Sequence, residues 1–176
     1  MTKEIKLKSE EFITEENKGT YAGLKFSEDT VNRLINYAQN NDVPNILSED
    51  EFHSTLLYSR KFLPEYKPKG MLDTSSLATP EKVEIWESPA NAFKDKATRC
   101  LVLKYNCNEQ VDRFNQLMDE HDATYDYDEY KPHTTLSYDV GDMQVEDFSA
   151  VEEIGKLEIV EEYVEELNLD KNYDSD

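Results

Sequence analysis

The heptapeptide HSTLLYS at residues 53–59 decides the fold, because residues 133–139 of the same chain read HTTLSYD. The copies share His, Thr, Leu and Tyr at equal offsets and hold two of the three histidines. Residues two apart on a β-strand point to one face, so each copy offers an imidazole and a hydroxyl to a common surface. These pairs are His53 with Thr55 and His133 with Thr135. The alternate residues are expected to pack in a core: Leu56, Tyr58, Leu136 and Tyr138.

The segments that precede the two heptapeptides also match in order. A strand predicted at 20–26 (TYAGLKF) is followed by a helix and His53, and a strand predicted at 99–105 (RCLVLKY) by a helix and His133. From position 20 to 53 is 33 residues, and from 99 to 133 is 34. We interpret this agreement as an internal duplication.

Helical periodicity predicts two helices in the α+β domain that this pattern indicates. Ser27 can cap the first helix, which ends by Pro44. Asn106 or Asn108 is expected to cap the second, which runs to about His121. Its buried face is expected to hold Val111, Phe114, Leu117 and Met118.

Further strands are predicted at 82–88 and 129–139. Residues 155–167 alternate in period two and predict another strand, although a helix is a real rival for 161–167. Residues 60–80 contain three of the six prolines and are interpreted as a long connection.

The length of 176 residues indicates one domain, long enough to bury about 70% of its unfolded surface. We assign this domain to 20–169, an N-terminal extension or lid to 1–19 and a frayed acidic tail to 170–176.

The charge distribution bounds the class of ligand. The formal net charge is -20, and residues 139–176 hold 14 Asp or Glu against 2 Lys, whereas residues 53–104 hold 9 Lys or Arg against 6 acids. Such a field repels duplex DNA and long RNA. It still admits a small anion, because the field is screened within about 8 Å.

Cys100 and Cys107 are the only cysteines, and no apolar run or charged leader precedes the domain. This composition favours a cytoplasmic protein with reduced thiols and no membrane partner, and a monomer is expected. No Cys/His spacing fits zinc, so neither a metal nor a cofactor is expected.

Two imidazoles on one surface are suited to metal-independent phosphodiester chemistry. A neutral imidazole can take a proton from the attacking hydroxyl while a protonated one gives a proton to the leaving oxygen. The Thr55 and Thr135 hydroxyls can donate to the phosphate oxygens. A lone strand histidine is more often structural, but the duplicated motif favours catalysis for His53 and His133. His121, which lacks a Thr partner, is interpreted as a helix-end cation.

With two H-x-[ST] motifs, the chain resembles the 2H phosphoesterases, and stretches such as GTYAGLKFSEDT and ATYDYDEYKPHTTLSYDVGD resemble the anti-CBASS phosphodiesterases of phages. The resemblance spans about 19–167. It implies a bilobal α+β fold, with two pseudo-symmetric, mostly antiparallel lobes around a catalytic groove. The implied activity is 2'-OH-driven cleavage of 3'-5' bonds in cyclic di- and trinucleotide signals, which blocks bacterial CBASS defence in the host cytoplasm. The alternatives are an enzyme acting on RNA 2',3'-cyclic phosphate ends and a non-catalytic nucleotide sponge.

Substrate-binding residues are predicted on the same strands. Trp86, the only tryptophan, lies opposite the apolar residues of its strand and can stack on a base. Tyr21 is the second stacking candidate, and the resemblance favours Glu161 as a contact to a base amine. Arg60 and Lys131 flank the motifs and can attract phosphate.

Overall fold

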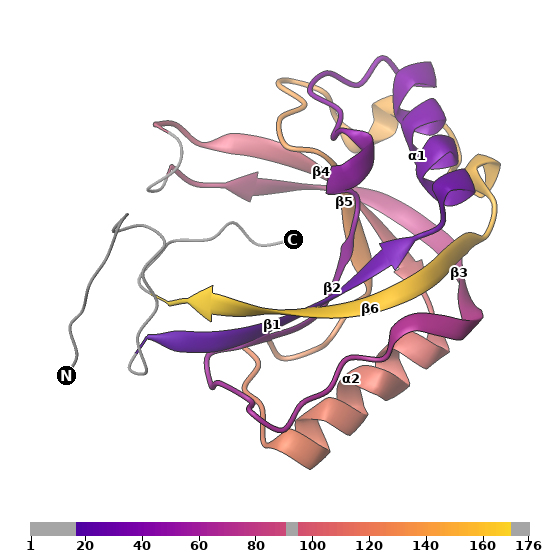
Figure 1. Ribbon diagram of the computed structural model, residues 1–176. Coiled ribbons are helices and arrows are strands. Elements are labelled where there is room, and N and C mark those ends of the chain that lie inside the picture. Colours follow the sequence, from indigo (N-terminus) through magenta and orange to yellow (C-terminus); the bar gives the residue numbers. More distant parts are fainter. Residues whose placement is uncertain (1–16, 91–94, 170–176) are drawn as a thin grey trace.

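The computed structural model describes residues 17–90 and 95–169. Within these ranges it is an α+β structure with two α-helices and one six-stranded sheet of order β2-β1-β6-β3-β4-β5, antiparallel throughout (Figure 1). The predicted fold class, α+β, is confirmed, and both predicted halves contribute to a single continuous sheet. The elements are β1 (Lys18–Phe26), α1 (Glu28–Asn40), η2 (Glu49–Glu51), β2 (Ser54–Ser59), β3 (Gly70–Ser88), β4 (Thr98–Asn106), α2 (Asn108–His121), β5 (His133–Ser137), η3 (Val145–Asp147), η4 (Val151–Ile154) and β6 (Leu157–Asn168).

One face of the sheet packs against both helices and forms the core. Alternate residues of β1 and β4 point into it, including Ala22, Leu24, Leu101 and Leu103, which are at most 5% exposed. In Figure 1, α2 runs along the lower side of β1 and β6, while α1 stands at the upper right. The opposite face of the sheet is therefore not covered by either helix.

The first helix follows its sequence signals. Ser27 is the N-cap of α1, and its hydroxyl accepts a hydrogen bond from the Thr30 amide at 3.2 Å, as predicted. Leu34 and Ala38 are fully buried on the expected face.

The second helix corrects the predicted cap. Its N-cap is Cys107, whose side chain makes no capping bond, rather than Asn106 or Asn108. Phe114 and Leu117 are buried as predicted. Gln110 of the same helix is also buried, and apolar periodicity does not predict a buried position for a polar residue.

The predicted long connection at 60–80 is wrong in its second half, because β3 already begins at Gly70. Residues 72–75 bulge out of the ladder with β6, and Pro80 sits beside a register shift to β4. Proline is tolerated at such irregularities because no ladder amide is needed there. Pro64 and Pro68 thus lie in the predicted connection, whereas Pro80 marks an irregularity within β3.

The rival interpretations of 161–167 are settled in favour of a strand. β6 pairs with β1 from Glu161 to Asn168 and with β3 through Gly70 and Met71, so it lies inside the sheet. Ladder partners on both sides outweigh the helix propensity of the glutamates.

Both ends of the described chain are tied into the sheet. The Leu169 amide donates to the Asn17 carbonyl at 2.7 Å, and β1 starts at Lys18, two residues before the predicted domain boundary. The remainder of the predicted extension, 1–16, and the tail, 170–176, lie outside the described residues. Neither helix in the described ranges has the length and apolar content needed to span a membrane.

A buried ion pair joins α2 to the sheet. Glu162 of β6 is 2% exposed and accepts from Arg113 Nε at 2.9 Å and Nη2 at 2.8 Å. Tyr66 donates to the same carboxylate at 2.7 Å, and the Lys69 amide donates at 3.2 Å. Burial, and then the hydrogen bond to Glu162, raise the pKa of Tyr66 far above its usual value, so it remains a neutral donor.

Glu162→Gln should lower the free energy of unfolding by about 3 kcal/mol, because it leaves the Arg113 guanidinium buried without its counter-charge. Urea denaturation measures this loss. The exposed Lys61–Asp122 pair is the control, and Lys61→Ala should cost less than about 1 kcal/mol. Equal losses in the two variants would contradict the stabilising role of the buried pair.

Candidate functional site

The face of the sheet opposite the core carries all seven predicted site residues, and we call it the histidine face. Register places Gly23 opposite Thr55 and Lys104 opposite His133, and residues opposite each other in a ladder point to the same side. Further members on the other strands follow from the same ladders: Tyr21, Trp86, Thr135 and Glu161.

The two histidine segments are joined by a reciprocal pair of hydrogen bonds. The Ser54 hydroxyl donates to the His133 carbonyl at 2.8 Å, and the Thr134 hydroxyl donates to the His53 carbonyl at 2.7 Å. Ser54 and Thr134 follow their histidines at equal offsets, and both are at most 1% exposed. The edge strands β2 and β5 thus meet at the histidines, although they lie at opposite ends of the strand order.

A buried network from α2 supports this junction. Gln110 donates to the Ser54 hydroxyl at 3.1 Å and to the Tyr130 hydroxyl at 2.7 Å, and it accepts from Tyr105 at 2.7 Å. Tyr130 in turn donates to the Thr55 carbonyl at 2.7 Å. The polar atoms of Gln110 are satisfied, which explains its burial and orients the Ser54 hydroxyl toward His133.

Both heptapeptides contain a bulge at the same position. The ladder passes from Thr55 to Leu57 and from Thr135 to Ser137, so the fourth residue of each copy has no partner. One extra residue reverses the alternation that follows. The core prediction is therefore confirmed for Leu56 and Leu136 and wrong for Tyr58 and Tyr138, which are half-buried and 38% exposed.

The imidazoles are held in the same way. Nδ1 of His53 lies 2.9 Å from the Glu51 carbonyl oxygen, and Nδ1 of His133 lies 2.9 Å from that of Lys131. A carbonyl oxygen only accepts, so Nδ1 carries the proton in both rings. Nε2 is then the nitrogen that can exchange protons with a ligand.

Tyr21 lies beside the first histidine. Its hydroxyl is 3.0 Å from Thr55 Oγ1, and its ring meets the His53 ring edge-on at 6.2 Å between centroids. The structure thus brings together three of the predicted residues from β1 and the start of β2.

Trp86 lies beside the second histidine, on the outward side predicted for it, while Val83 and Ile85 pack against the core. The indole and imidazole centroids are 4.7 Å apart. Nε2 of His133 is buried and makes no hydrogen bond to any described residue. This nitrogen therefore keeps its capacity for one more hydrogen bond.

Glu161 lies opposite Lys25 and Met71 in the two ladders of β6. It is on the histidine face, but its strand does not pair with either heptapeptide at this position. Tyr163, two residues on, was not predicted. Its ring occupies the space that a Cβ on Gly23 would fill, 2.4 Å from that position, and its centroid is 6.2 Å from that of Tyr21. The glycine opposite Thr55 was the only sequence signal for this close approach.

Lys104 is a second residue that sequence reasoning missed. It is directly opposite His133, its side chain is 14% exposed, and its Nζ lies 3.5 Å from Glu84 Oε2. In the sequence, Lys104 could have been found as the one charged residue that alternates with the apolar Cys100 and Val102 along its strand.

The other basic candidates are engaged elsewhere. Arg60 forms two hydrogen bonds with Asp126, at 3.0 and 3.1 Å, and Lys131 pairs with Glu129 at 3.5 Å. His121 ends α2, as predicted.

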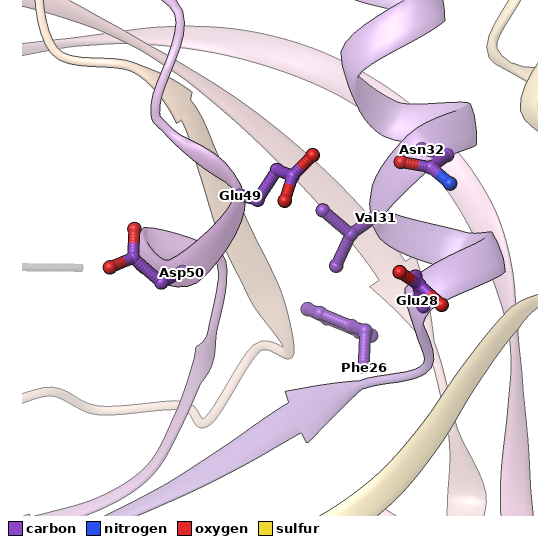
Figure 2. A pocket seen from close by; sticks show the side chains of 6 residues that line it. All are labelled: Phe26, Glu28, Val31, Asn32, Glu49 and Asp50. Atoms are coloured by element: carbon purple, nitrogen blue, oxygen red, sulfur yellow. The ribbon is translucent and has the colours of Figure 1, made fainter.

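A cavity of about 320 Å³ lies between η2 and the start of α1, and no histidine lines it (Figure 2). Its polar lining consists of Glu28, Asn32, Glu49 and Asp50, over an apolar floor of Phe26 and Val31. Three carboxylates repel a phosphate, so this cavity is not suited to a nucleotide.

The comparisons with known proteins agree with the extent of the described domain. The family model described as "Anti-CBASS protein Acb1" matches residues 18–174. The protein of that name from Vibrio phage KVP40 is 34% identical over 155 residues, which cover 88% of this chain and 91% of the relative. The one from Enterobacteria phage T4 is 33% identical over 152 residues, covering 86% and 90%.

The carbonyl contacts predict that neutral His53 and His133 carry their proton on Nδ1, the less common tautomer of free histidine. Long-range ¹H–¹⁵N NMR at alkaline pH distinguishes the tautomers, and the chain contains only three histidines. His121, which has no such carbonyl contact among the described residues, is the internal control. A proton on Nε2 in either heptapeptide would show that these contacts are absent in solution.

Proposed function

Because the chain belongs to the anti-CBASS protein Acb1 family, we propose that it is a phosphodiesterase that cleaves the cyclic nucleotide signals of bacterial CBASS defence. The observation that carries the proposal is the junction of the heptapeptides, where the hydroxyls of Ser54 and Thr134 join the two histidine backbones. The substrates are cyclic di- and trinucleotides with 3'-5' bonds.

The histidines act as a general acid–base pair. One Nε2 accepts the proton of the ribose 2'-OH, which attacks the adjacent phosphorus, while the other protonates the departing 5' oxygen. The product is a 2',3'-cyclic phosphate, which water then opens to a 3'-phosphate with the roles of the histidines exchanged. The Nδ1 contacts to Glu51 and Lys131 support this role, because they direct Nε2 away from the backbone in both rings.

Hydroxyls stabilise the charge that develops on phosphate. Thr55 and Thr135 donate to the non-bridging oxygens. Lys104, opposite His133 on the same face, pairs with Glu84 instead. None of these steps requires a metal, and we propose a metal-independent reaction.

We further propose that the two halves are duplicated lobes of a 2H phosphoesterase, each presenting one motif to a shared groove. The equal offsets of the bulges at Leu56 and Leu136 support this origin, as do the matched imidazole contacts. The predicted monomer and cytoplasmic location remain part of the proposal.

An aromatic ring beside each histidine suits a substrate with more than one base. Tyr21 contacts the His53 ring and Trp86 contacts the His133 ring, so bases on either side of the scissile phosphate can stack while that phosphate lies between the imidazoles. Glu161 is proposed to accept from an exocyclic amine, because it shares this face.

His53→Ala and His133→Ala should each lower the rate of 3',3'-cyclic GMP-AMP cleavage in EDTA by about 10² to 10⁴, since each removes one proton-transfer group. Product is followed by chromatography, and His121→Ala should retain full activity. A stable ligand recovered intact on heating would indicate a sponge. Preferential cleavage of RNA 2',3'-cyclic phosphate ends would instead indicate the alternative function, an enzyme that acts on RNA ends.

Tyr21→Leu should raise the KM for a cyclic dinucleotide by about 10-fold, because it removes a stacking surface worth about 1 to 3 kcal/mol. Tyr21→Phe keeps the ring and removes only the hydroxyl beside Thr55, so a smaller change is expected. Initial rates over a range of substrate concentrations separate the two effects. An equal KM in Tyr21→Leu and the parent protein would exclude stacking at this position.

A further inference from the structure

We propose that Glu84 is a positioning residue that holds the indole of Trp86 against the imidazole of His133. The inference rests on the proposed function, in which His133 transfers a proton. It assigns a role to a carboxylate that touches neither the imidazole nor the reacting phosphate.

The contact that fixes the indole comes from its own strand. Glu84 and Trp86 are two apart on β3 and share the histidine face, opposite Val102 and Cys100. Trp86 Nε1 donates to Glu84 Oε1 at 2.8 Å. Because the indole has a single polar group, this bond selects one orientation of the ring. In that orientation the ring is tilted 56° to the imidazole of His133.

The carboxylate is itself anchored by two cations. Its second oxygen, Oε2, lies 3.3 Å from Lys82 Nζ and 3.5 Å from Lys104 Nζ. Lys104 is opposite both Lys82 and His133 in the ladders of β4, so the chain of contacts leads from β5 through β4 to β3. One oxygen of Glu84 therefore accepts the hydrogen bond of the indole, and the two lysines hold the other oxygen in place.

Glu84 carries a negative charge at neutral pH. Burial alone would raise its pKa, but the hydrogen bonds from Trp86 and Lys82 and the charge of Lys104 outweigh burial, and the pKa lies below its ordinary value. The carboxylate is thus ionised at neutral pH and is a strong acceptor for the indole N–H.

The position of the indole matters because of the nitrogen beside it. Nε2 of His133 is buried without a hydrogen bond to any described residue, and Trp86 packs on the same ring. An indole free to rotate would admit water to this nitrogen and would lose the fixed plane on which a base stacks. Glu84 therefore serves both proton transfer and base binding through one hydrogen bond.

The test uses Trp86 fluorescence, which is specific because the chain has one tryptophan. A protonated imidazole quenches a neighbouring indole, so emission of the parent protein should fall as His133 gains its proton, and His133→Ala should lose this change. Glu84→Ala should lose most of it and lower kcat/KM by about 10-fold or more, the value of a hydrogen bond to a charged group. Glu84→Gln should restore much of the change, since its amide oxygen still accepts from Nε1.

Glu87→Ala is the matched control, because Glu87 is an exposed carboxylate of the same strand, one residue beyond Trp86. It should leave the titration and activity unchanged. A full fluorescence change in Glu84→Ala, whatever its activity, would overturn the proposal, as would a Glu87→Ala effect of equal size. Loss of the change in Glu84→Ala would support the positioning role even if the parent protein fails to cleave cyclic nucleotides, which would refute the proposed function alone.

Discussion

The structure depends on the crossed hydrogen bonds in which Ser54 and Thr134 each hold the carbonyl of the other segment's histidine. β2 and β5 are the two edges of the strand order, and this junction joins them at their first residues. Both donors are buried, so losing either partner would leave an unsatisfied polar atom. The same constraint that closes the fold therefore places the imidazoles, and fold and site are not separable here.

Support for the junction comes from polar residues buried beneath it rather than from apolar packing alone. Gln110 links α2 to Ser54, and Tyr130 links the segment before β5 to the backbone of Thr55. A network whose members are satisfied fixes one geometry, whereas apolar contacts tolerate small shifts. A fixed geometry matters for proton transfer, because the donor and the acceptor must lie within hydrogen-bonding distance of each other.

The sequence predicted the parts that follow local periodicity. The helices, the outward side of Trp86 and the common side of His133 and Thr135 all follow from periods of 3.6 and 2. The bulge at Leu56 escaped prediction, because an extra residue in a ladder leaves no trace in composition, and so Tyr58 was assigned to the wrong side. The contacts of the site with Gln110, Lys104 and Tyr163 also escaped, because they depend on strands that pair far along the chain.

The position of β6 in the sheet has a consequence for biosynthesis. β6 lies between β1 and β3, yet it is made after the other five strands. While the chain emerges from the ribosome, β1 can pair only with β2, and the edge that β6 will occupy stays open. Long-range pairing of this kind is slow and leaves a nascent chain prone to association. Once β6 has been made, its acidic side chains, among them Glu165 and Glu166, oppose pairing of this strand with other copies before it enters the sheet.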